Sequence, residues 1–207
     1  LFISSKNPLC CRLSRSDCAM SPVNTILLFI PIRVKSILSC SYEAFWHSSA
    51  HLLAQTILFF HPQAKLTIGP AIDNGFYYDV DFGSESISEN DFKKIEDKML
   101  EFARQKFEFE MRSVSKADAL SYYKESNNEF KVELIENLTD GDITFCDHSD
   151  FTDLCRGGHV PNTGIIKAVK IMSVAGAYWR GDENKPQLTR VYGISFPKQK
   201  KVSIYGP

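Results

Sequence analysis

The chain has 207 residues, of which 43% are hydrophobic and 24% charged, a composition typical of a folded globular protein rather than a disordered one. The net charge is only −1, so no global basic field favours tight binding to nucleic acid through its phosphates. The apolar run of residues 25–32 is too short to cross a bilayer and contains Pro31, which argues against a membrane span.

Residues 1–40 differ in composition from the remainder. They hold five basic side chains against one acidic side chain, whereas the rest of the chain holds 19 against 24. We expect this segment to be a poorly ordered leader; its Ser- and Arg-rich, acid-poor composition is also compatible with an organellar transit peptide. Four of the six cysteines lie here, and Cys146 and Cys155 have no disulfide-like spacing. A reduced, cytoplasmic protein is therefore expected, with an organelle as the alternative.

The next stretch predicts a helix followed by a hairpin. Apolar residues recur at helical spacing over residues 42–60, and Pro62 then ends the pattern. Two strand-like stretches, residues 64–72 and 75–82, flank the sequence Asp-Asn-Gly, which is a strong turn signal.

Residues 88–125 predict a helix, a strand and a second helix. Ser88 precedes Asp91 by three residues, a near capping box, and apolar residues then repeat at helical spacing up to residue 102. Residues 107–114 alternate apolar and polar side chains, which predicts a half-exposed strand. Ser115 then opens a shorter helix.

The last third predicts mainly strands. Helix and strand signals compete over residues 130–138, and we favour a helix there. Residues 143–159 indicate a strand followed by a loop, while residues 165–179 and 188–196 read as long strands of one antiparallel sheet. The sum is an α+β domain over residues 41–201, a mostly antiparallel sheet with packed helices, followed by a divergent tail at 202–207.

Two half-motifs supply the chemistry. His47 and His51 lie four apart on the first predicted helix, so both rings point to one side. Cys155 and His159 are also four apart, but the intervening Gly-Gly pair and a following Pro predict a turn. Three imidazoles and one thiol form the ligand set of a tetrahedral zinc site, although packed core histidines remain the alternative.

The motifs HSSAHLLAQ, IGPAIDNGFYYDVDF, FKVEL, DLCRGGHVPNTG and SVAGAYWRGD, followed by LTRVYGISFPKQK, closely resemble one family. In order and spacing they are similar to the editing domain of bacterial-type threonyl-tRNA synthetase, which is related to that of alanyl-tRNA synthetase. The resemblance covers about residues 42–201. It implies the editing-domain fold and a post-transfer editing hydrolase that cleaves the ester of mischarged seryl-tRNA(Thr) in tRNA aminoacylation quality control, without the ATP-dependent aminoacylation core.

The resemblance also assigns roles to residues. His47 and His51 would position water and substrate, with His47 the better candidate base, and Lys131 would stabilise negative charge or help to activate the water. Asp153 would fix a ring tautomer or hold the serine amino group. Cys155 and His159 complete the predicted catalytic set, with Cys155 open as nucleophile, ligand or small wall of the pocket.

Further assignments are weaker. Tyr78 matches a family position near the substrate but could equally be a core aromatic, and Arg156 and Arg180 are candidates for contacts with acceptor-end phosphates. No cofactor is expected to be required. Zinc is allowed, with candidate ligands His47, His51, Cys155 and His159, although the threonyl domains generally work without it.

Two departures from the family pattern matter. Gly158 stands where the family usually has proline, which is expected to loosen the turn that aims His159. The chain shows neither the family's leading domain nor its catalytic core, so the expected partners are the acceptor end of tRNA(Thr) carrying serine and the remaining synthetase domains. The competing interpretations are an inactive fragment of a threonyl-tRNA synthetase and a zinc-binding structural module.

Overall fold

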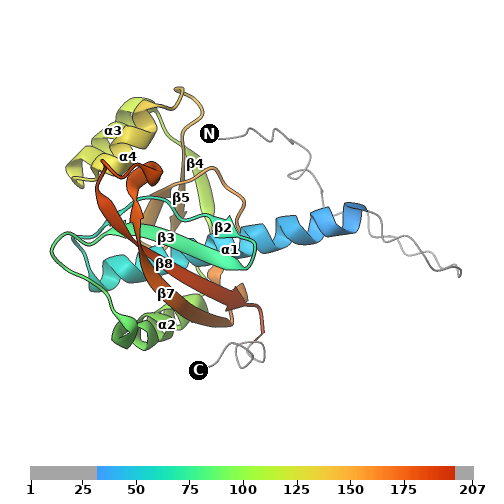
Figure 1. Cartoon of the computed structure of the whole chain (residues 1–207). Helices are drawn as coiled ribbons and strands as arrows, with labels where there is room; N and C mark the ends of the chain where they lie inside the picture. The colour runs from blue at the N-terminus through green and yellow to red at the C-terminus, as the bar shows by residue number, and fades with distance from the viewer. Residues whose placement is uncertain (1–31, 199–207) are drawn as a thin grey trace, which may run out of the picture.

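A long helix, whose C-terminal part lies between two antiparallel sheets and whose N-terminal part projects beyond them, organises the molecule (Figure 1). The computed structural model describes residues 32–198, and for residues 32–41 only the backbone is described. The predicted tail at 202–207 and most of the predicted leader at 1–40 lie outside the described residues. Among the described residues, no helix is long and apolar enough to span a membrane.

The α+β class predicted from the sequence is confirmed. The larger sheet has the order β1-β3-β8-β7, with β2 paired to β3, and the smaller one has the order β4-β5-β6. The larger sheet contains β1 (Lys65–Leu66), β2 (Ala71–Ile72), β3 (Gly75–Asp81), β7 (Ala168–Tyr178) and β8 (Gln187–Phe196). The smaller sheet contains β4 (Glu110–Ser113), β5 (Thr144–His148) and β6 (Phe151–Leu154).

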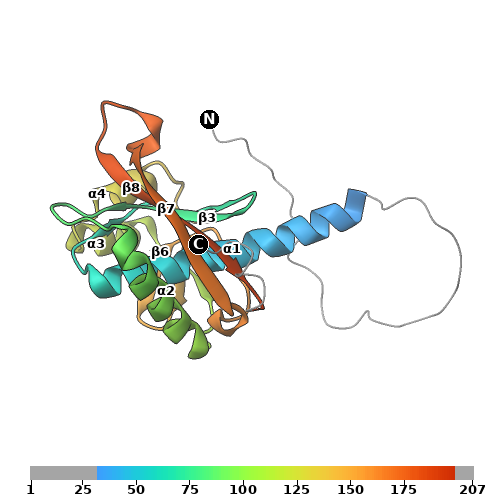
Figure 2. The same cartoon turned by 60° about the horizontal axis from the view of Figure 1, so that its bottom comes forward.

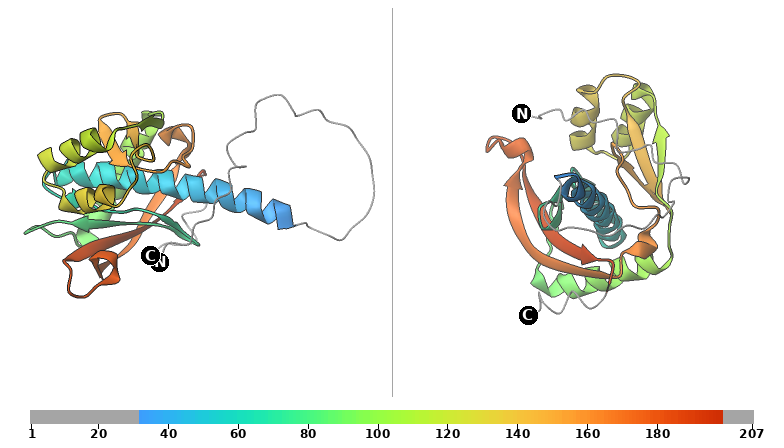
Figure 3. Two further views of the ribbon diagram at one scale, coloured as in Figure 1. Left: turned by 90° about the horizontal axis from the view of Figure 1, so that it is seen from above. Right: turned by 90° about the vertical axis from the view of Figure 1, so that its right-hand side faces the viewer.

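Helix α1 (Ile32–Phe60) passes between the two sheets, as the view along its axis shows (Figure 3). It begins ten residues before the predicted start at Tyr42, inside the segment predicted to be a leader. From Ser48 to Ile57 every residue is buried, because protein surrounds the helix on all sides. Polar side chains on this stretch are therefore held in the interior, which is where a site can be built.

Helix α2 (Glu89–Arg104) covers the larger sheet and crosses β7 (Figure 2). The backbone amide of Ser88 donates to the Asp91 carboxylate at 2.8 Å, which confirms the predicted start of this helix. The main core lies between α1, α2 and the larger sheet. Its buried side chains include Leu52, Leu53, Ile57, Phe76, Tyr78, Val80, Ile95 and Met99.

Helices α3 (Lys116–Glu125) and α4 (Glu129–Glu136) lie together at one end of the molecule, and the helix favoured over residues 130–138 is confirmed. Ser115 caps α3 by accepting from the amide of Asp118, as predicted. Asn128 caps α4 and also donates from Nδ2 to the carbonyl of Leu66 at 2.8 Å, which ties α4 to β1.

Two of the predictions about strands need correction. Residues 143–159 contain a hairpin of two strands, β5 and β6, rather than one strand, because the turn at Ser149 takes a positive φ of 53°. The predicted loop follows β6 and covers residues 155–159. Strand β4 is shorter than predicted, and its four residues are all exposed at the edge of the smaller sheet, where it pairs with β5. The two long strands predicted over residues 165–179 and 188–196 are confirmed as β7 and β8, which pair antiparallel in the larger sheet.

The predicted hairpin at Asp-Asn-Gly is confirmed. Ile72 pairs with Gly75, so Asp73 and Asn74 form a two-residue turn between β2 and β3. Gly75 has a φ of +126°, and a Cβ built there would lie 2.3 Å from the carbonyl oxygen of Gly193. Only glycine fits this crossing of β3 and β8.

Candidate functional site

Helix α1 presents two histidines to one point in the interior. The rings of His47 and His51 meet edge to face with centroids 4.9 Å apart, as their spacing of four residues predicts. His51 is buried, whereas His47 is half-buried. His47 is therefore the ring that a bound molecule could reach from solvent.

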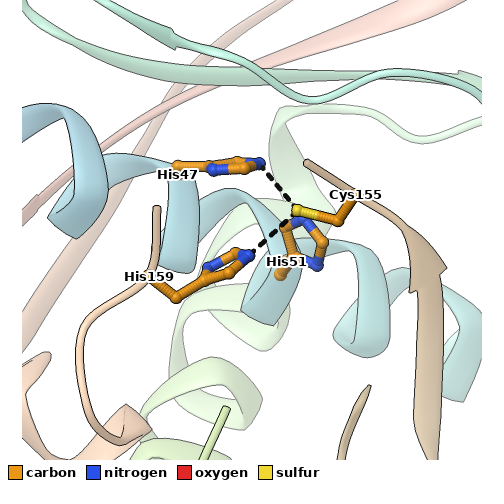
Figure 4. A group of neighbouring side chains, drawn as sticks. All are labelled: His47, His51, Cys155 and His159. Atoms are coloured by element: carbon orange, nitrogen blue, oxygen red, sulfur yellow. Dashed lines mark hydrogen bonds between the residues drawn. The ribbon is translucent and has the colours of Figure 1, made fainter. Parts of the chain in front are cut away.

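The segment after β6 brings a thiol and a third imidazole to the same point (Figure 4). Gly157 and Gly158 both take positive φ, 92° and 83°, and this turn folds His159 back over Cys155. Cys155 Sγ lies 3.1 Å from His159 Nε2 and 3.7 Å from His47 Nε2. One candidate ligand atom from each of the four side chains lies within 4.8 Å of the others.

Ser48 fixes the tautomer of His159. Its hydroxyl donates to the carbonyl of Ala44 at 2.8 Å and lies 3.1 Å from His159 Nδ1. With its single hydrogen committed to Ala44, the hydroxyl accepts from Nδ1–H of His159. The lone pair of the neutral ring is then on Nε2, which faces the Cys155 sulfur.

A buried ion pair lies beneath the histidines. Lys131, on α4, and Asp153, on β6, are 2% and 3% exposed, and Nζ lies 2.5 Å from Oδ1. The hydroxyl of Tyr78 donates to Oδ2 at 2.5 Å and that of Tyr123 to Oδ1 at 3.4 Å. Since Oδ2 also lies 4.0 Å from His51 Nε2, Asp153 connects the lysine to the histidine cluster.

The electrostatic environment distinguishes the histidines. Burial lowers the pKa of His47, but the Cys155 hydrogen bond and charge and the Asp153 charge outweigh it, so the pKa rises above 6.5. Burial lowers the pKa of His159 to about 4 against the opposing effect of Cys155. His159 is therefore neutral near pH 7, whereas His47 is poised to exchange a proton.

Cys155 has a second thiol beside it. A hydrogen bond from Cys146 lowers the pKa of Cys155 well below that of a free thiol, although burial opposes this. The same hydrogen bond, together with burial, raises the pKa of Cys146. Both cysteines are free.

The remaining predicted residues lie in different settings. Tyr78 is fully buried, with its hydroxyl on Asp153, so it contacts the candidate site from the core. Arg156 is exposed next to Cys155. Arg180 is exposed in the connection between β7 and β8, where its Nε lies 3.3 Å from the carboxylate of Glu133.

Sequence reasoning missed three neighbours of the site. Cys146 pairs in register with Asp153 across the β5–β6 hairpin, so recognising that hairpin would have placed it there. Tyr123 reaches Asp153 from α3, and Ser48 reaches His159 from α1. No local pattern marks these two residues, because only the packing of distant elements brings them to the site.

Comparison with known proteins gives consistent matches. Residues 143–192 match the family described as the threonyl and alanyl tRNA synthetase second additional domain. The chain is 69% identical over 163 residues to a threonine–tRNA ligase of Flavobacterium johnsoniae and 68% identical to that of Flavobacterium psychrophilum. A threonine–tRNA ligase of Cytophaga hutchinsonii is 56% identical over the same length. Each match covers 79% of this chain and 25% of the relative, so the chain spans about a quarter of these proteins.

Proposed function

Since the chain belongs to the family of threonyl-tRNA synthetase second additional domains, we propose that it hydrolyses the ester of serine mischarged onto tRNA(Thr). The half-exposed His47 beside a buried Lys131–Asp153 pair is the observation that carries this proposal. This arrangement supports the proposal because ester hydrolysis needs a group that accepts a proton from water, and a nearby positive charge stabilises the developing oxyanion.

A second site is needed because serine and threonine are hard to separate by binding. They differ by one methyl group, which is worth only about 1–3 kcal/mol in a binding pocket. A separate hydrolytic site that admits serine and rejects threonine multiplies this discrimination. Serine-selective hydrolysis is therefore the activity to look for.

In the proposed mechanism His47 takes a proton from a water molecule that attacks the ester carbonyl carbon. The Lys131 ammonium stabilises the negative charge that develops on the carbonyl oxygen. The carbon–oxygen bond to the terminal ribose then breaks, and the leaving oxygen takes the proton back from His47. The products are serine and a tRNA with a free terminal hydroxyl.

The other site residues position these groups. Asp153 holds the Lys131 ammonium, and its own carboxylate is fixed by the hydroxyls of Tyr78 and Tyr123. The same carboxylate is a suitable acceptor for the serine ammonium group. His51 and His159 line the water position, and Cys155 forms the wall between them.

The substrate and partners follow from the same proposal. The acceptor end of tRNA(Thr) carries the serine, and the exposed Arg156 and Arg180 are candidates for its phosphates. Residues 41–207 carry more acidic than basic side chains, so this chain alone should bind the tRNA body weakly, and the remaining synthetase domains would hold it. The proposed location of this reaction is the cytoplasm.

The test is release of labelled serine from seryl-tRNA(Thr), with threonyl-tRNA(Thr) as the control substrate. We expect selective release that falls about 10²–10⁴-fold in His47→Ala and about 10²–10³-fold in Lys131→Ala. His61→Ala is the matched control, because His61 lies outside the cluster and pairs with Glu85. No serine release from a folded wild-type chain would contradict the proposal and favour the inactive alternative.

Zinc binding is the second candidate function, favoured by the four converging ligand atoms and by the hydrogen bond that orients His159. A tetrahedral zinc ion with bonds of about 2.0–2.3 Å requires ligand atoms about 3.3–3.7 Å apart, so the cluster would have to contract. With all four side chains bound, the ion would have no open position for water and would supply a structural crosslink. One zinc per chain that is lost in Cys155→Ser, with no hydrolysis, would support this alternative.

A further inference from the structure

Helix α4 links the candidate catalytic pair to a distant connection in the sheet. Lys131 and Glu133 are two residues apart, so they project from opposite sides of this helix. Lys131 faces Asp153, whereas Glu133 faces the connection between β7 and β8. A shift of α4 therefore moves the Lys131 ammonium.

Glu133 is the centre of a cluster of contacts from that connection. One carboxylate oxygen accepts from Trp179 Nε1 at 2.8 Å. The other lies 3.0 Å from Lys185 Nζ and 3.3 Å from Arg180 Nε. The Trp179 hydrogen bond, supported by the two cations, lowers the pKa of Glu133, so the carboxylate is ionised at neutral pH.

Apolar packing also joins α4 to the connection between β7 and β8. Phe130 lies on the same side of α4 and its ring meets that of buried Trp179 with centroids 5.2 Å apart. Arg180 takes a left-handed backbone conformation, with φ 56° and ψ 20°, which is unfavourable for a residue with a side chain. The connection thus holds a strained conformation in which three of its side chains converge on Glu133.

We infer that Glu133 is a positioning residue: by fixing α4 to the β7–β8 connection, it holds the Lys131 ammonium at Asp153 for the proposed hydrolysis. This inference rests on the proposed function. Asn128 anchors the start of α4 independently through Leu66. Loss of Glu133 should therefore let the helix pivot without unfolding it.

The test compares Glu133→Ala and Glu133→Gln with Glu136→Ala in the full chain. Glu136 lies on the same helix and is exposed, and no ion pair of its carboxylate occurs within the described part of the chain. Because a misplacement of about 1 Å can cost about 10²-fold in rate, we expect kcat for seryl-tRNA(Thr) to fall about 10–100-fold in Glu133→Ala. Glu133→Gln keeps an acceptor for Trp179 and should retain part of this rate, with KM changed less than about twofold in both variants.

Amide hydrogen exchange in α4, measured on the same variants, is the readout independent of activity. Faster exchange in α4 of Glu133→Ala, with β5 unchanged, is the expected result. The inference would be overturned if kcat of Glu133→Ala were unchanged, or if Glu136→Ala lost as much kcat as Glu133→Ala. It would also be overturned if Glu133→Ala raised KM at constant kcat, because that result would indicate that Glu133 acts through RNA contacts of Arg180 and Lys185. An inactive wild-type chain would refute the proposed function instead, and unchanged exchange in α4 would then also refute the coupling.

Discussion

Replacing Lys131 with methionine is the sharpest test of the buried ion pair. Methionine is also long and unbranched, so the variant removes the ammonium group while it keeps most of the side chain. Asp153 would then be buried at 3% exposure without its cation, keeping only the hydroxyl donors of Tyr78 and Tyr123. The cost is therefore mainly that of an uncompensated buried charge.

The expected magnitude follows from that environment. Breaking a buried ion pair typically costs about 3–5 kcal/mol, and the two remaining donors place Lys131→Met near the lower end. For a domain of this size, about 3 kcal/mol corresponds to a fall in Tm of about 6–12 °C. This is a large part of the stability of a typical domain, so the variant should remain folded at room temperature but melt much earlier.

Thermal unfolding followed by circular dichroism measures the effect, with Asp153→Asn and the double variant completing the cycle. Since the double variant contains neither charge, it should be more stable than the sum of the single effects by about 2 kcal/mol or more. A loss below about 1 kcal/mol in Lys131→Met, together with additive effects, would refute the reasoning. That result would mean that water screens the pair.

Three further predictions concern the loop at the site, a buried imidazole and a helix cap. Gly158→Pro should abolish hydrolysis and destabilise the fold by more than about 1 kcal/mol, because proline cannot adopt a φ of +83°. Gly158→Asn is the control in the serine-release assay, because asparagine can adopt a positive φ. An active proline variant would show that the turn before His159 has a different conformation. Among the described residues, neither ring nitrogen of His148 has a hydrogen-bond partner, and burial, aided by the His51 and His159 charges, lowers its pKa to about 3. Between about pH 6.5 and 3, His148 then binds a proton in the unfolded state only, so the wild-type protein loses stability as the pH falls through this range. His148→Phe removes this loss, and its free energy of unfolding in urea should exceed that of the wild type by about 2 kcal/mol more at pH 5 than at pH 7. An equal difference at both pH values would contradict a lowered pKa for His148. Hydrogen bonds from Ser88 lower the pKa of Asp91, so Asp91→Ala should lower the free energy of unfolding at pH 7 by about 1 kcal/mol at most, because solvent screens this exposed carboxylate. The loss should vanish as the pH falls through the lowered pKa of Asp91. A difference in thermal unfolding that stays constant from pH 7 to 2 would be inconsistent with the cap.

The departure at Gly158 shows how sequence and structure inform each other. The sequence predicted a looser turn because glycine replaces the usual proline of the family. The structure instead gives Gly158 a positive φ that proline cannot adopt, and Gly157 beside it does the same. The loop therefore reaches His159 by a route available to two glycines, and His159 still contacts Cys155.

Local signals made several elements predictable from the sequence. The turn at Asp73 and Asn74, the start of α2 at Ser88 and the pairing of His47 with His51 all depend on residues at most four apart. Such contacts are set by backbone geometry within one turn or one helix. The family resemblance added Lys131, which by its sequence setting alone would have been interpreted as a surface lysine.

The tertiary structure alone decided what surrounds those residues. Lys131 is buried on α4, where its ammonium meets Asp153 of β6. Tyr123 reaches the site from α3, and Cys146 reaches it through the β5–β6 register. Residues 48–57 of α1 are all buried because this part of the helix lies between the two sheets, and no amphipathic pattern in the sequence predicts this. These outcomes depend on contacts between different elements, and some of the residues involved are far apart in the chain, such as Cys155 and His47. The burial of a side chain and its charged neighbours are set by the elements that pack around it, whereas a sequence pattern reflects only interactions between residues close together in the chain.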